Sequence, residues 1–233
     1  MLMEDVMKRI FVTFVVSVLI GMGSTVWASP LVIDLTTASQ GSIPGGSQVN
    51  DLLGRGISTE GWYGANLMLE QNALVTFEFI GEEAGWNNYF EADADNDGNW
   101  STLFTNNGSA WGSSYSTVFE ADAFNFRFAA QAGQNGYATN GSNPDDAGDQ
   151  SDDPNFFITE FTQSISLGES TLLGTESLEA GIYLWFDDGG AGQDDNHDDM
   201  LIRVSAQTVP EPGTMALFGL GIIGLAGVLR KRF

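Results

Sequence analysis

The sequence has no cysteine and only one histidine, His197, among its 233 residues. The lack of cysteine excludes disulfide bonds, thiol nucleophiles and thiolate metal sites, so stability must come from core packing, hydrogen bonds or bound metal. A single histidine argues against zinc catalysis, which usually needs two or three imidazole ligands. The motifs GxSxG and HExxH and a phosphate-binding loop are also missing. We therefore expect a protein that is not an enzyme.

Basic residues are also scarce. Eight Lys and Arg stand against 31 Asp and Glu, which gives a net charge of −23. Three of the carboxylates (Glu4, Asp5 and Glu211) lie outside residues 29–209, so 28 remain there against three arginines, for a charge of −25. This balance excludes nucleic acid as a partner, because phosphate binding needs a basic patch. Divalent cations would relieve the resulting self-repulsion.

Residues 1–28 follow the order of a secretory signal peptide. MLMEDVMKR is a charged head, and IFVTFVVSVLIGMGSTV carries no charge. This run leads into VWA, residues 26–28, which places small Val26 and Ala28 at the −3 and −1 positions of a cut before Ser29. The alternative is an uncleaved membrane anchor. We expect cleavage, which leaves residues 29–209 as one domain that is long enough to bury a core.

The last part of the chain reads VPEPGTMALFGLGIIGLAGVLRKRF. Its apolar run, residues 213–229, is 17 residues long. As a helix it would measure roughly 25 Å, which is short for a bilayer core of about 30 Å but sufficient to predict a transmembrane helix. The basic residues Arg230, Lys231 and Arg232 follow it and should stay in the cytoplasm.

Three features of this tail occur together: Pro210-Glu211-Pro212, a Gly-rich apolar helix, and the basic cluster. In this order they resemble the PEP-CTERM sorting signal, over residues 210–233. The resemblance implies that exosortase, a membrane protease, recognises the tail and cuts it near the PEP. It also implies transient contact with the inner membrane through both termini. The destination would be the cell surface or extracellular matrix of a bacterium that makes exopolysaccharide and biofilm.

Period-two alternation of apolar and polar residues predicts an all-β domain. In ALVTFEFIG, for example, Val75, Phe77 and Phe79 alternate with polar residues. Strands are predicted at 31–37, 73–81, 123–130, 156–161, 164–168, 181–188 and 200–206, with weaker candidates at 101–104 and 115–120. Such a series favours an antiparallel β-sandwich, jelly-roll-like. The polar segment 131–155 is predicted to be a long surface loop.

The stretch FDDGGAGQDDNHDDMLIRV, residues 186–204, predicts a hairpin with an acidic, Gly-rich loop. The hairpin would bring Asp187 or Asp188 close to Asp198 or Asp199. Close carboxylates raise each other's pKa unless a cation intervenes, and calcium takes six to eight oxygen ligands. The predicted ligands are Asp187, Asp188, Asp195, Asn196, Asp198 and Asp199. A solvated acidic turn without metal is the alternative.

A second candidate metal site is EADADNDGNWSTLF, residues 91–104. Asp93, Asp95, Asp97 and Gly98 match the start of an EF-hand loop, but Phe104 stands where that loop needs a glutamate. The EF-hand interpretation therefore fails. A different calcium loop between strands, or an Asp-Asn-Gly turn without metal, remains.

The body also resembles a recurring type of PEP-CTERM surface protein, through GEEAGWNN and the FDDGGAG…DDNHDD hairpin. This implies that Glu82 and Glu83 lie with the acidic hairpin. Seven aromatic residues suit either the core or stacking on sugars: Trp62, Tyr63, Trp86, Tyr89, Trp100, Trp111 and Tyr115. We expect a structural or adhesive surface protein. The alternatives are a carbohydrate-binding module for extracellular polysaccharide and a matrix glycan hydrolase that uses two carboxylates.

Overall fold

The computed structural model describes residues 29–43, 50–145, 153–189 and 196–209. Across these ranges the chain is all-β with antiparallel sheets, as predicted, and has one short 3-10 turn, η1 (Ala130–Gly133). Within the same ranges, no helix is long and apolar enough to cross a membrane. The predicted signal peptide and transmembrane helix lie outside the described residues.

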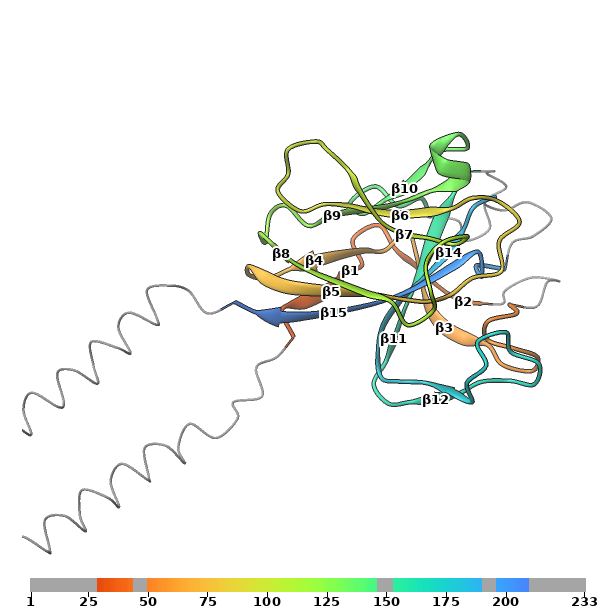
Figure 1. Ribbon diagram of the computed structural model, residues 1–233. Coiled ribbons are helices and arrows are strands. Elements are labelled where there is room, and N and C mark those ends of the chain that lie inside the picture. The colour runs from red at the N-terminus through yellow and green to blue at the C-terminus, as the bar shows by residue number, and fades with distance from the viewer. Residues whose placement is uncertain (1–28, 44–49, 146–152, 190–195, 210–233) are drawn as a thin grey trace, which may run out of the picture.

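The larger sheet has seven strands in the order β2-β3-β11-β14-β15-β5-β8 (Figure 1). They are β2 (Ser39–Ile43), β3 (Thr59–Tyr63), β5 (Ala73–Gly81), β8 (Ser114–Phe119), β11 (Asn155–Phe161), β14 (Gly181–Asp187) and β15 (Met200–Thr208). β14 lies in the middle of the sheet, and β2 and β8 form its edges. The predicted hairpin is confirmed, because β14 pairs with β15 and sets Phe186 opposite Met200.

The smaller sheet has four strands in the order β10-β9-β6-β7. They are β6 (Tyr89–Asp93), β7 (Ser101–Thr105), β9 (Asn125–Ala129) and β10 (Tyr137–Thr139). Two further pairs are formed by β1 (Leu31–Asp34) with β4 (Asn66–Leu69), and by β12 (Ile165–Ser166) with β13 (Ser177–Leu178). In Figure 1, β9, β6 and β7 form a layer above β5 and β15.

Alternating phenylalanines join the two layers. The predicted inward positions of β5 and β9 are buried: Val75, Phe77, Phe79, Phe126 and Phe128. The ring of Phe77 meets that of Phe90 from β6 with centroids 4.9 Å apart, and Phe128 stacks on Phe186 of β14 at 4.5 Å. Each buried phenylalanine contributes roughly 1.5–3 kcal/mol. These contacts pack the two sheets face to face, while the jelly-roll connectivity stays a prediction.

β14 is buried on both of its faces. Leu184 and Phe186 point into the core between the sheets, and Tyr183 and Trp185 point into a second core on the opposite side. There the indole N–H of Trp185 donates a hydrogen bond to Thr159 Oγ1 at 2.9 Å. Burial on both faces explains why this strand reads as a continuous apolar run without alternation. It also means that β14 ends inside the molecule, where Asp187 is fully buried.

Six strands have no clear signal in the sequence: β2, β3, β4, β6, β10 and β13. They are short, and their apolar residues do not alternate over enough positions to be recognised. The prediction of a surface loop over 131–155 is wrong in part, because β10 pairs with β9. Buried Asn143 also donates to the carbonyls of Ala65 (3.0 Å) and Phe156 (2.7 Å). The amide hydrogen bonds of Asn143 and the burial of Ala138 in the core hold the described part of this segment in place.

Candidate functional site

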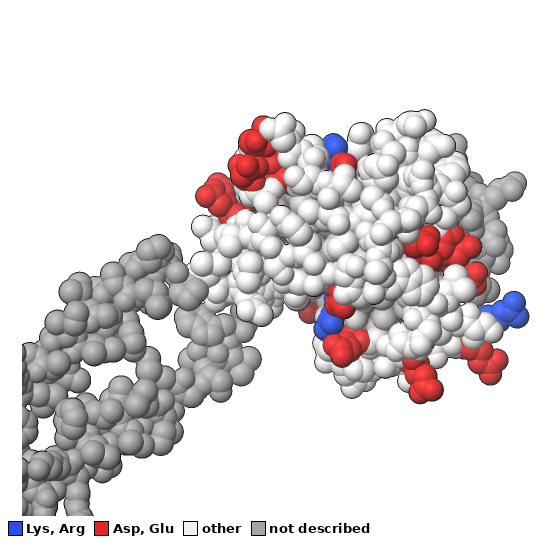
Figure 2. Space-filling model, in the orientation of Figure 1, with Lys and Arg blue, Asp and Glu red and all other residues white. Residues whose placement is uncertain are grey.

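The acidic residues are unevenly distributed. On the face drawn in Figure 2, acidic side chains lie in separate patches with wide uncharged surface between them. Further aspartates are buried: Asp93, Asp187, Asp188, Asp198 and Asp199. Burial of a carboxylate is costly unless the group is hydrogen-bonded, paired or neutralised. The buried aspartates therefore mark the places where a cation would matter most.

The first group of aspartates lies in the loop from β6 to β7. β6 ends at Asp93, whose carboxylate accepts hydrogen bonds from the backbone N–H groups of Asp97 (3.2 Å) and Gly98 (3.0 Å). These bonds wrap the loop around the Asp93 side chain. Left-handed backbone at Asn96 (φ 53°) and Gly98 (φ 85°) lets the turn close, as asparagine and glycine do most readily.

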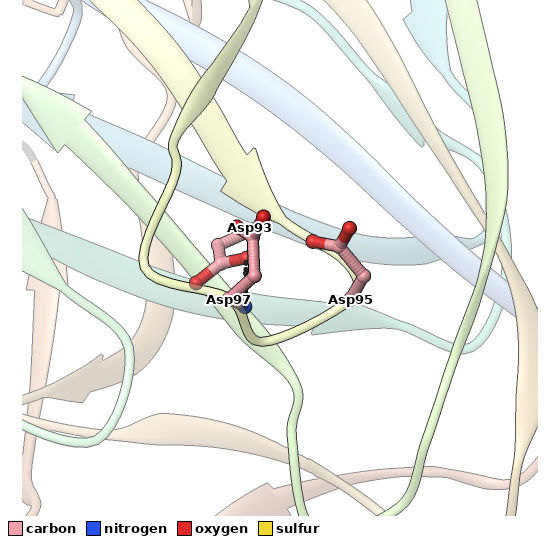
Figure 3. Close-up of side chains that lie close together, drawn as sticks. All are labelled: Asp93, Asp95 and Asp97. Carbon is pink, nitrogen blue, oxygen red and sulfur yellow. Dashed lines mark hydrogen bonds between the residues drawn. The ribbon is translucent and has the colours of Figure 1, made fainter.

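Asp93, Asp95 and Asp97 bring one carboxylate oxygen each within 4.8 Å of the others (Figure 3). Asp95 and Asp97 are exposed, whereas Asp93 is buried under the loop. Hydrogen bonds from the side chain and backbone of Asn99 lower the pKa of Asp97, which keeps it ionised. Clustered carboxylate oxygens are the ligands that hard cations prefer. This loop can therefore hold a metal ion.

The second group lies at the base of the β14–β15 hairpin. Asp187, Asp188, Asp198 and Asp199 are each less than a tenth exposed. The backbone N–H of Asp188 donates to Asp199 Oδ2 at 2.7 Å, and that of Asp199 donates to the carbonyl of Phe186 at 3.1 Å. The predicted approach of the two strand ends is confirmed. These four residues are buried, not solvated. The choice between a metal site and a turn without metal stays a prediction, and Asp195 lies outside the described residues.

Side chains and backbone from distant loops enclose the hairpin base. Asn88 Nδ2 donates to Asp188 Oδ2 at 2.6 Å, and the backbone N–H of Asp51 donates to Asp198 Oδ2 at 2.6 Å. Asn50 Nδ2 reaches the backbone carbonyl of Asn196 at 2.8 Å. Sequence reasoning assigned no role to Asn50 or Asn88. Asn50 belongs to no recognisable pattern, and Asn88 is the last residue of GEEAGWNN, of which only Glu82 and Glu83 were singled out.

His197 lies in the same base and is fully buried, with left-handed backbone (φ 57°). Burial lowers its pKa to about 3, so the ring is neutral at pH 7. Its Nε2 lies 2.8 Å from Asn155 Oδ1, and an amide oxygen accepts, so Nε2 carries the proton. Nδ1 lies 3.9 Å from Asp187 Oδ2. A neutral ring gives Asp187 no positive charge.

Asp199 carries the clearest electrostatic signal of the group. Burial, and next the nearby charge of Asp188, raise its pKa to about 9, far above its usual value. Asp187 and Asp198 add to the same effect. These four carboxylates therefore cannot all be ionised at neutral pH without a compensating charge. A divalent cation would supply that charge and return the group to its ionised form.

A backbone hydrogen bond places Glu83, and with it the neighbouring Glu82, next to the hairpin base. The N–H of Glu83 donates to the carbonyl of Asp198 at 2.9 Å. The carboxylate of Glu82 accepts from the N–H of Ala84 at 3.0 Å and so closes its own turn. The implied neighbourhood is confirmed for the backbone, and a shared ligand role for these side chains stays a prediction.

The aromatic residues divide between core and surface. Tyr63 packs against Phe157 in the second core, with ring centroids 4.6 Å apart. Trp100 instead lies on the outer face of the smaller sheet, 4.1 Å from the Arg127 guanidinium. The same guanidinium lies 3.9 Å from the centroid of the Tyr137 ring. The most exposed of the seven are Trp86, Trp111 and Tyr115, which are the ones available to a ligand.

Comparison with known proteins adds one finding. Residues 208–232 match the PEP-CTERM protein-sorting motif, which includes Pro210, Glu211, Pro212 and the basic cluster. Neither the curated proteins nor the solved structures gave a significant match to the chain. The chain thus carries a PEP-CTERM sorting motif, the mark of an exported protein that is processed by exosortase.

Proposed function

We propose that this domain is a non-enzymatic component of the cell surface or extracellular matrix, with a structural or adhesive role. The observation that carries this proposal is the position of the motif. β15 is the last described strand and ends at Thr208, where the motif begins. The folded domain is therefore attached to the sorting tail without an intervening linker. Removal of the tail would release the domain outside the inner membrane.

The test uses the full chain in a bacterium that has an exosortase. We expect the wild-type protein in the surface or matrix fraction, shortened by loss of the tail. The double variant Glu211→Ala, Pro212→Ala should stay in the membrane fraction at full length, and Thr214→Ala, a neighbouring control, should be processed normally. Recovery of the wild-type protein from the periplasm or cytosol would contradict the proposal.

We also propose that calcium binds both groups of aspartates, with different affinities. The loop at Asp93, Asp95 and Asp97 offers three carboxylates, two of them exposed, so water would fill the other ligand positions. Its affinity should be low, about 10⁻⁴–10⁻³ M, as in extracellular calcium modules. The hairpin base offers four buried carboxylates. Calcium there would offset repulsion between buried charges and should bind more tightly.

A calcium role outside the cell would suit a protein whose domain carries this large negative charge. Thermal unfolding in calcium and in chelator tests both sites together. A cation that binds only the folded state raises the unfolding midpoint. Asp95→Asn should remove part of that shift, whereas Asp122→Asn, an exposed aspartate outside both groups, should leave it unchanged. Equal midpoints for the wild-type protein would contradict the calcium proposal.

A further inference from the structure

A pocket of 310 Å³ lies between the edge strands of the two sheets. β7 is the last strand of the smaller sheet, and β8 is the last strand of the larger one. The pocket is lined by residues of β6, β7 and their loop on one side and by β8 on the other. Its volume falls at the lower end of the ~300–1,000 Å³ range of small-molecule sites. It therefore suits a ligand of about one ring.

The pocket exists because the aromatic core stops short of this corner. The pairing of β6 with β7 shifts register after Phe90, which lies opposite Phe104. The next core-facing residue of β6 is Ala92, which lies opposite the exposed Ser101, so two small side chains follow two phenylalanines. Such a register shift re-aims side chains at sheet edges. Because no aromatic ring fills this position, a space remains between the sheets, and Thr117 of β8 lines its other side.

The lining combines one aromatic ring with hydrogen-bonding groups. Tyr115 presents a ring that is 43% exposed. Asn99, Ser101 and Thr117 supply an amide and two hydroxyls, and Asp95 is the single charged residue among those that line the pocket. Since the only charge is negative, the pocket disfavours anions. A neutral molecule with an apolar face and several hydroxyls fits both features, and a sugar ring has this character.

We propose that this pocket binds a neutral sugar residue of a polysaccharide. The apolar face of the ring packs on Tyr115, and its hydroxyls donate to Asp95 and exchange hydrogen bonds with Asn99 and Ser101. The site lies apart from Trp86 and Trp111, which do not line the pocket. This inference adds a ligand to the proposed matrix role. It rests on that role only for the assumption that the protein meets polysaccharide outside the cell. Its test uses purified protein and so does not depend on sorting.

The test measures retardation of the exported protein in native gels that contain a neutral polysaccharide: dextran, mannan or xyloglucan. A chelator is present throughout, so that calcium does not occupy the Asp93–Asp97 loop and compete for Asp95. We expect retardation by at least one of these polymers. Tyr115→Ala should weaken it by roughly tenfold, the scale of a lost stacking contact. Trp111→Ala is the matched control, because its ring is equally exposed (44%) but lies outside the pocket.

A second variant separates loss of the ring from loss of the fold. Thr117→Trp keeps Tyr115 but fills the pocket, so it should abolish retardation. Its near-UV circular dichroism spectrum should match that of the wild type apart from the added indole. Equal loss in Tyr115→Ala and Trp111→Ala would overturn the proposal. Retardation only by an anionic polymer such as alginate, or by none of the polymers, would overturn it as well.

Discussion

The two groups of aspartates place the same residue type in different environments, one in an open loop and the other in a buried hairpin base. In the loop from β6 to β7, backbone N–H groups satisfy Asp93, while Asp95 and Asp97 remain in water. At the hairpin base, four aspartates are buried, and asparagines and backbone from distant loops close over them. Both groups lie at strand ends. What distinguishes them is whether other segments pack over the strand end.

The largest loss of stability should come from a substitution that opens the buried aspartates at the hairpin base. Asn88 is fully buried, donates to Asp188 and accepts from the backbone N–H of Gln131 at 3.1 Å. Asn88→Ala leaves a buried carboxylate with one hydrogen bond fewer, which should cost about 3 kcal/mol in the free energy of unfolding. Urea denaturation measures this cost. Asn107→Ala, at an exposed position in the loop after β7, should change it by less than about 0.5 kcal/mol. Equal unfolding midpoints for the two variants would show that the base contributes no particular stability.

A smaller effect is expected in the pH dependence of the free energy of unfolding. Measured in chelator, it should distinguish the two groups of aspartates. Asp199 has a folded pKa of about 9 against a usual value of 3.8, so the folded state holds a proton that the unfolded state has lost. Stability therefore falls as pH rises through this window. His197 acts oppositely, since its folded pKa of about 3 costs stability as pH falls below 6.5. The two effects oppose each other between about pH 4 and 6.5.

Of these two effects, that of Asp199 alone operates between pH 6.5 and 9. We expect the free energy of unfolding to fall there by up to about 1.4 kcal/mol per pH unit. Asp199→Asn should flatten this slope, and saturating calcium should do the same in the wild-type protein by favouring the ionised carboxylate. Asp97→Asn serves as the control and should keep the slope. An equal slope in both variants would refute the assignment to Asp199.

The smallest effect should come from the open loop. With calcium at ten times the dissociation constant, a bound ion stabilises the fold by about 1.4 kcal/mol. Asp97→Asn should lose most of this increment and otherwise unfold as the wild type does, because the side chain is exposed. Differential scanning calorimetry over a calcium series gives the increment. A loss in Asp122→Asn as large as in Asp97→Asn would instead indicate a general effect of charge.

Patterns within single segments of the sequence predicted those strands and turns whose residues show a clear alternation or composition. The alternation of Val75, Phe77 and Phe79 fixed β5 to the residue, and the Gly-rich acidic loop indicated the hairpin. Burial of the hairpin base was not predictable, because it depends on partners such as Asn88, which is 100 residues away from Asp188. The pocket was missed for the same reason. It arises from a register shift between β6 and β7 that no single segment encodes.

A calcium titration of the thermal unfolding midpoint tests the contrast between the two groups most directly. The wild-type protein should show two rises, one at low and one at high calcium concentration. Asp198→Asn, at the hairpin base, should lose the first rise, and Asp95→Asn, in the open loop, should lose the second. A wild-type midpoint that is the same in calcium and in chelator, or a single rise lost equally in both variants, would contradict the account.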